Sequence, residues 1–225
     1  MKVNNKTFKL VFSALMVAVA TVLSLFKIEF IYGGSITIFS MVPLVLVAQM
    51  YGVPWGFLTC SVYGLIQMVM GLNNFGYVTG IVAYVIVFLF DYVLAFAVVG
   101  FSGVTRKLKS KALAAGLGSI IGCFLRFACH FISGITVWKA MAWDEAPSFV
   151  TPRLLQADMV PYTYSFFYNG GYMFPEMILT AIGSAIICTI VFETLKIDVN
   201  ATSSKKLKEA ANANLSAESE KKTEE

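Results

Sequence analysis

Long apolar runs separated by short polar connections account for most of the chain. A transmembrane helix needs about 20 consecutive apolar residues, within a range of about 17–25. Six runs approach this length, and they cover residues 8–26, 36–51, 54–71, 77–101, 112–137 and 168–195. The pattern therefore predicts an all-α integral membrane protein with six transmembrane helices.

The composition supports this interpretation of the apolar runs. Of the 225 residues, 58% are hydrophobic and 13% are charged, whereas a soluble domain carries about 25% charged residues. The first run follows Lys2, Lys6 and Lys9, as in a secretory signal peptide. Its apolar stretch is longer than the roughly 7–15 residues usual in such peptides, so we expect it to be retained as the first membrane helix.

Positively charged residues are distributed unevenly over the connections. With a cytoplasmic N-terminus, the inner side carries the lysines of the C-terminal tail together with Lys2, Lys6, Lys9, Arg106, Lys107, Lys109, Lys111 and Lys196. The outer side carries Lys27, Lys139 and Arg153, and this asymmetry agrees with the positive-inside rule. An even number of helices returns the C-terminus to the cytoplasm. We expect a membrane domain over residues 1–197 and a polar, disordered cytoplasmic tail over residues 198–225.

The motifs that would supply enzymatic chemistry or energy are missing from the sequence. It contains no GxxxxGK[ST] phosphate-binding loop, no HExxH metal motif and no serine nucleophile elbow. The cysteines lie in apolar runs without metal-ligand spacing, at Cys60, Cys123, Cys129 and Cys188. We therefore expect no enzymatic activity, no cofactor and no metal. Such a protein conducts passively, acts as a receptor or takes energy from partner subunits.

Polar residues interrupt the later apolar runs, where a lipid-facing position would be costly. Asp91 lies in the fourth run, Arg126 and His130 in the fifth, and Asn169 and Glu176 in the sixth. Arg126 and His130 are four residues apart, and Asn169 and Glu176 are seven apart, so each pair lies on one helical face. We expect a shared polar interior in which Arg126 pairs with Asp91 or with Glu176.

Aromatic and small residues surround the single histidine. Gly134 lies one turn beyond His130, where a missing side chain would leave room for a flat ring, and Trp138 is close to the same face. Tyr164 and Asn169 lie at the outer end of the next run. Aromatic faces attract cationic rings, and histidine and asparagine can both donate and accept hydrogen bonds. The sequence therefore predicts a site for a small, nitrogen-rich aromatic ligand.

Two segments, ACHFISGITVW at 128–138 and YSFFYNGGYMFPE at 164–176, resemble the thiamine-specific S component of energy-coupling factor transporters. The resemblance extends over residues 8–195. It implies a six-helix subunit of the bacterial plasma membrane that captures thiamine from outside. Delivery inward would follow docking to one transmembrane coupling subunit and two ATP-binding subunits, which alone would use ATP.

The resemblance also implies roles for individual residues. The ligand-binding residues would be Asp91, Tyr92, His130, Gly134, Trp138, Trp143, Tyr164 and Asn169. Ala14 and Ala18 would form the surface that docks on the coupling subunit, because small residues four apart permit close helix approach. Asp91 stands where the family has a glutamate, and the family tryptophan of the first outer loop has only Phe30 or Tyr32 as candidate replacements.

Two alternatives to thiamine capture stay open. The shorter acid at Asp91 could suit a thiamine precursor or another nitrogen heterocycle. A membrane enzyme or a scaffold that uses Asp91, Arg126, His130 and Glu176 is the other alternative, and an enzyme would show turnover by the isolated chain.

Overall fold

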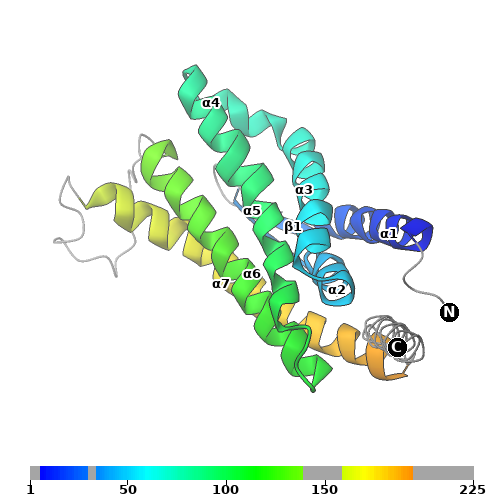
Figure 1. Cartoon of the computed structure of the whole chain (residues 1–225). Helices are drawn as coiled ribbons and strands as arrows, with labels where there is room; N and C mark the ends of the chain where they lie inside the picture. The colour runs from blue at the N-terminus through cyan, green and yellow to red at the C-terminus, as the bar shows by residue number, and fades with distance from the viewer. Residues whose placement is uncertain (1–5, 30–33, 139–158, 195–225) are drawn as a thin grey trace, which may run out of the picture.

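The computed structural model describes residues 6–29, 34–138 and 159–194, which are mainly helical (Figure 1). A small antiparallel hairpin pairs β1 Lys27–Glu29 with β2 Ser35–Thr37. The helical elements are α1 Lys6–Ser24, α2 Val42–Tyr51, α3 Val53–Met70, η2 Leu72–Tyr77, α4 Ile81–Val87, η3 Phe88–Val93, α5 Leu94–Ala97, η4 Val98–Thr105, α6 Lys111–Thr136, α7 Val160–Thr189 and η7 Ile190–Thr194.

Five helices in the described part of the chain are long and apolar enough to cross a membrane. The all-α membrane class is therefore confirmed, but the prediction of six full-length spans is not reproduced. The run at 36–51 forms only the ten-residue helix α2, because its first residues pair with β1 and the helix begins at Val42. Pro43 occupies the first turn, where proline suits a helix start. The predicted tail over 198–225 lies outside the described residues.

Helix α7 begins at Val160, earlier than the start at residue 168 expected from the apolar run. Pro161 stands in its first turn, where the missing backbone N–H has no intrahelical partner to lose. The mixed aromatic and polar residues that follow are therefore helical rather than part of a loop. This places Tyr164, Tyr168 and Tyr172 on one helical face, at intervals of one turn.

The fourth apolar run forms the helix Ile81–Thr105, here called the fourth span, which changes its helical winding along its length. Its middle segment η3 is a π-helix, a conformation that occurs mostly as single turns and often at functional sites. Asp91 lies within this segment. Further along, a Cβ atom at Gly100 would overlap the backbone of Gly56 and Phe57. The glycine therefore allows the fourth span to pack directly against α3.

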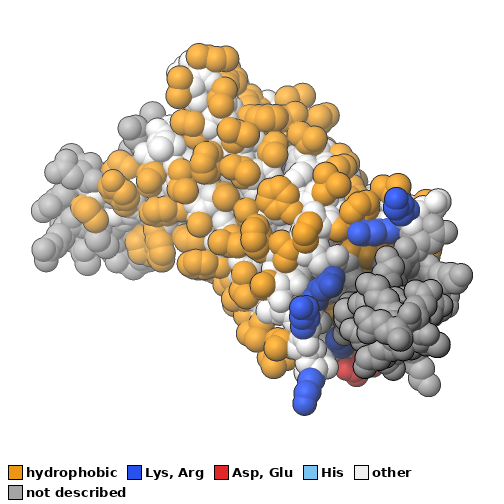
Figure 2. All heavy atoms as spheres, in the orientation of Figure 1, with side chains coloured by type: hydrophobic (Ala, Val, Ile, Leu, Met, Phe, Trp, Pro, Cys, Tyr) orange, Lys and Arg blue, Asp and Glu red, His pale blue; other side chains and the backbone are white. Residues whose placement is uncertain are grey.

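One end of the bundle is basic, whereas hydrophobic side chains cover most of the face shown in Figure 2. Lys107 and Lys109 are exposed in the connection between η4 and α6 at this end. Nearby, the buried Gln49 of α2 donates its Nε2 hydrogens to the carbonyl oxygens of Ser102 at 2.6 Å and Ala114 at 3.1 Å. This side chain ties α2, η4 and α6 together at the end that the charge pattern predicts to be cytoplasmic.

Candidate functional site

A cavity lies at the end of the bundle opposite the basic residues, among the outer ends of α1, α3, the fourth span, α6 and α7. The residues predicted to bind the ligand all line this cavity wherever the structure describes them: Asp91, Tyr92, His130, Gly134, Trp138, Tyr164 and Asn169. Trp143, Phe30 and Tyr32 lie outside the described residues. The cavity therefore brings together residues of the fourth span, α6 and α7, the later helices in which the sequence analysis expected the ligand site.

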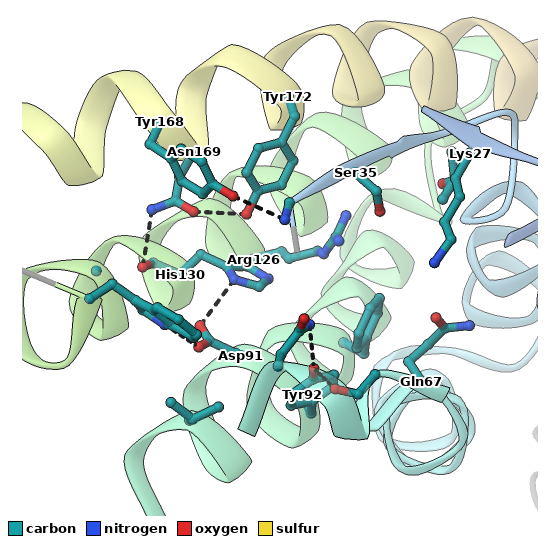
Figure 3. Close-up of a pocket in the computed structure, with 18 of the residues that line it drawn as sticks. Lys27, Ser35, Gln67, Asp91, Tyr92, Arg126, His130, Tyr168, Asn169 and Tyr172 are labelled. Atoms are coloured by element: carbon teal, nitrogen blue, oxygen red, sulfur yellow. Dashed lines mark hydrogen bonds and ion pairs between the residues drawn. The ribbon is translucent and has the colours of Figure 1, made fainter. Parts of the chain in front are cut away.

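Asp91 is the centre of a hydrogen-bonded cluster at one side of the cavity (Figure 3). Its Oδ2 accepts hydrogen bonds from Ser133 Oγ at 2.8 Å and from Trp138 Nε1 at 2.9 Å. Its Oδ1 lies 3.1 Å from His130 Nδ1. The π-helical segment of the fourth span thus brings a short acidic side chain within reach of Ser133 and His130 on α6 and of Trp138 just beyond the end of this helix.

The imidazole of His130 has one nitrogen next to Asp91 and one without a partner in the described part of the chain. Nδ1 faces Asp91, whereas Nε2 is buried and has no hydrogen-bond partner among the described residues. The ring meets that of Tyr172 edge to face, with centroids 6.5 Å apart. Buried polar atoms in folded proteins nearly always have a partner, so Nε2 is a candidate for contact with a ligand.

Asn169 and Gly134 bring α6 and α7 close together beside this cluster. Asn169 donates to the carbonyl oxygens of Ser165 at 2.9 Å and His130 at 3.3 Å, and its Oδ1 accepts from Tyr172 at 2.8 Å. The position that a Cβ atom at Gly134 would take is filled by Ser165 Oγ. The glycine therefore permits helix packing and does not leave the space for a ring that the sequence suggested.

Tyr92 supports the outer turn between α3 and α4. Its hydroxyl donates to the carbonyl of Gly71 and accepts from Asn74 Nδ2, both at 3.1 Å. Its ring stacks on Phe75 with centroids 5.7 Å apart and an angle of 15° between the planes. Tyr92 thus lines the cavity and also holds the segment η2 in place over it.

The tyrosines of α7 form the opposite wall and contact the hairpin. Tyr164 stacks on Tyr168 with centroids 5.3 Å apart, and the Tyr168 ring meets Tyr172 edge to face at 5.7 Å. The Tyr168 hydroxyl accepts a hydrogen bond from the backbone N–H of Gly34 at 3.1 Å. These tyrosines of α7 therefore hold the backbone at Gly34, which directly precedes β2.

Beneath the hairpin, a buried ion pair resolves the pairing of Arg126 that the sequence left open. Arg126 Nη1 lies 2.5 Å from Glu176 Oε2, and the two side chains are only 9% and 2% exposed. The other Glu176 oxygen accepts hydrogen bonds from the hydroxyl of Thr37 and from its backbone N–H, the latter at 3.4 Å. Glu176 is thus the partner of Arg126 and also anchors β2 to α7.

The side of the cavity away from Asp91 is lined by residues that the sequence did not select. Figure 3 shows Lys27 and Gln67 on this side. Lys27 pairs with Glu29 at 2.6 Å, and Gln67 donates to Ser24 Oγ at 2.8 Å. The sequence analysis placed Lys27 on the outer side of the membrane but did not assign it to the site. Gln67 could not be predicted as a site residue, because a single amide near a helix end is common.

The residues expected to dock a partner lie on a free face of α1. Ala14 and Ala18 are both exposed, as is their neighbour Leu15 at 56%. The other face of α1 packs on α3, where Trp55 Nε1 donates to Ser13 Oγ at 2.8 Å. The small residues therefore point away from the bundle, as a docking surface requires.

The chemical character of the cavity is that of a binding site for a polar aromatic molecule. A carboxylate, an imidazole, an amide and several aromatic rings converge on it. Within the described residues, no group of three or more histidine, cysteine or acidic side chains is placed to hold a metal ion. The arrangement can recognise a small ligand by stacking and hydrogen bonding.

Comparisons with known proteins identify relatives of this chain. A family model described as thiamine transporter protein matches residues 10–196. The thiamine transporter ThiT of Bacillus subtilis (strain 168) is 29% identical over 211 residues, which cover 88% of this chain and 99% of that protein. A solved structure of ThiT from Listeria monocytogenes has a TM-score of 0.61 and 25% identity, covering 85% of this chain and 96% of that one. The region matched by the family model includes every residue that lines the cavity.

Proposed function

Because the chain belongs to the thiamine transporter protein family, we propose that it binds thiamine at the outer face of the cell membrane as the substrate-binding subunit of an importer. The family resemblance predicted from residues 128–138 and 164–176 is confirmed by these relatives. Both the family and the Bacillus subtilis protein are described as transporters, which agrees with the expectation that the chain is not an enzyme.

The convergence of Asp91, His130 and Trp138 on one side of the cavity carries the proposal. Thiamine joins an aminopyrimidine to a thiazolium ring that bears a permanent positive charge. The carboxylate of Asp91 attracts such a cation, and the attraction is stronger in a partly buried site than in water. Aromatic faces add cation–π attraction, and the unpartnered Nε2 of His130 can hydrogen-bond the ligand.

The energy for release would come from partner subunits. The sequence contains no phosphate-binding loop of its own, and in this proposal ATP is used by the partner subunits alone. In the proposed cycle it docks through α1 on a transmembrane coupling subunit, which is driven by two ATP-binding subunits. The exposed Ala14 and Ala18 support this orientation, because small side chains allow two membrane helices to approach closely.

Isothermal titration of the purified protein with thiamine tests the proposed function. We expect saturable binding by the wild type and a Kd at least fivefold higher for His130→Ala, because a buried hydrogen bond contributes about 1 kcal/mol. Leu58→Ala, an exposed position on α3, serves as a control that should bind normally. Absence of binding by folded wild-type protein at micromolar thiamine would refute the proposal.

Uptake of labelled thiamine by cells that contain the partner subunits tests the docking face. We expect Ala14→Leu combined with Ala18→Leu to reduce uptake severalfold, because larger side chains hold the two helices apart. Thiamine binding by the purified variant should be unchanged, since neither residue lines the cavity. Val82→Leu enlarges an exposed apolar residue on α4 and is the matched control. Normal uptake by the double variant would rule out this face.

A thiamine precursor is the second candidate ligand, which the aspartate at position 91 leaves open. Its side chain is one methylene shorter than the glutamate of the resembled family and reaches less far toward a bound ligand. Competition titrations with the separate pyrimidine and thiazole halves distinguish the two ligands. Thiamine is the ligand if it displaces either half and binds more tightly than both. If one separate half binds as tightly as thiamine, the precursor is favoured.

A further inference from the structure

Ser133 forms a hydrogen bond that the other hydroxyl groups of α6 do not form. Ser119 Oγ donates to the carbonyl of Ala115, and Thr136 Oγ1 to that of Ile132, each at 2.8 Å within the helix. Such bonds to a preceding carbonyl are the usual choice of helical serine and threonine. Ser133 Oγ instead reaches across to Asp91 Oδ2 at 2.8 Å, and the residue is fully buried.

The two oxygens of Asp91 have different partners. Oδ2 accepts from Ser133 and from Trp138, which together fix the rotation of the carboxylate. Oδ1 is thereby held toward His130 Nδ1 at 3.1 Å. A hydrogen bond at one ring nitrogen sets the orientation of an imidazole and the character of the other nitrogen. The chain of contacts therefore runs from the Ser133 hydroxyl to the buried Nε2 of His130.

We propose that Ser133 is a positioning residue for ligand recognition, which acts through Asp91 to fix the orientation of the His130 imidazole in the cavity wall. The inference rests on the proposed function, because its effect is read as thiamine affinity. Ser133 and His130 are three residues apart on α6, so both face the fourth span. Without the Ser133 donor, the carboxylate keeps Trp138 as its Oδ2 partner among the described residues and gains freedom to rotate.

Isothermal titration with thiamine is the first test, using wild type, Ser133→Ala and the matched control Ser119→Ala. Ser119 is equally buried on the same helix but bonds only its own backbone. We expect a Kd on the order of fivefold to tenfold higher for Ser133→Ala, and a change below twofold for Ser119→Ala. Ser133→Cys keeps the shape of the side chain but has a weaker hydrogen-bond donor, so it should also raise the Kd for thiamine. This variant preserves the test if Ser133→Ala fails to fold.

A double-mutant cycle with His130→Ala separates positioning from packing. If Ser133 acts through His130, adding Ser133→Ala to His130→Ala should change the Kd by less than twofold, because coupled residues are not additive. The same fivefold to tenfold loss in both backgrounds would overturn the proposal. Wild-type affinity in the well-folded Ser133→Ala and Ser133→Cys variants would also overturn it. Failure of the wild type itself to bind thiamine would instead count against the proposed function.

Discussion

Glu176→Ala is expected to lower the free energy of unfolding by about 3–5 kcal/mol, the range measured when one member of a buried ion pair is removed. The substitution leaves the guanidinium of Arg126 buried without its carboxylate. It also removes the acceptor for the hydroxyl and backbone N–H of Thr37. Equilibrium unfolding of the purified variant in mixed detergent micelles measures this loss.

Two comparisons make the result specific to the buried charge. Glu29→Ala removes a carboxylate that is 65% exposed and pairs with Lys27, so its effect should stay within about 1 kcal/mol. Replacing the pair together, as Arg126→Met with Glu176→Leu, should recover much of the stability, because apolar residues of similar size often substitute well for a buried pair. Equal stability of the Glu176→Ala and Glu29→Ala variants would contradict the assigned role.

Asp91→Ala is expected to weaken thiamine binding about a hundredfold. The substitution removes from the cavity the negative charge that would face the cationic ring, and it leaves Ser133 and Trp138 without their acceptor. Removing one partner of a desolvated charge pair in a binding site costs about 2–5 kcal/mol. A loss of about 3 kcal/mol corresponds to roughly a hundredfold change in Kd. Titration calorimetry of the purified variant measures it.

Asp91→Glu is the matched variant for this prediction. It retains the charge but adds a methylene where Ser133 and Trp138 already contact the carboxylate. We expect its affinity to fall between those of the wild type and Asp91→Ala. A Kd for Asp91→Ala within threefold of the wild type would show that the cluster does not contribute to ligand binding.

The membrane class and the later part of the site were predictable because polar residues in apolar runs are costly to place. This constraint identified Asp91, Arg126, His130 and Glu176, and helical periodicity indicated which of them share a face. It left two partners open for Arg126, because helix spacing alone does not give the contacts between helices. In the structure, α6 packs against α7, and this packing places Arg126 beside Glu176.

The hairpin and the short second helix could not be predicted in this way. Strands β1 and β2 have three residues each, too few for a clear alternation of polar and apolar positions. The hydrogen bond between Thr37 and Glu176 joins residues 139 positions apart, and no local sequence pattern predicts it. Ser133 was missed for a related reason, since a helical serine usually bonds its own backbone.

The anchoring of β2 by Glu176 has a consequence for biogenesis. Thr37 is synthesised long before Glu176, which belongs to α7. Until α7 has inserted, Gly34 lacks its contact with Tyr168, Arg126 lacks the carboxylate of Glu176 and the cavity lacks one wall. A nascent chain that has integrated only the helices before α7 therefore has no completed site, and ligand recognition requires the insertion of α7.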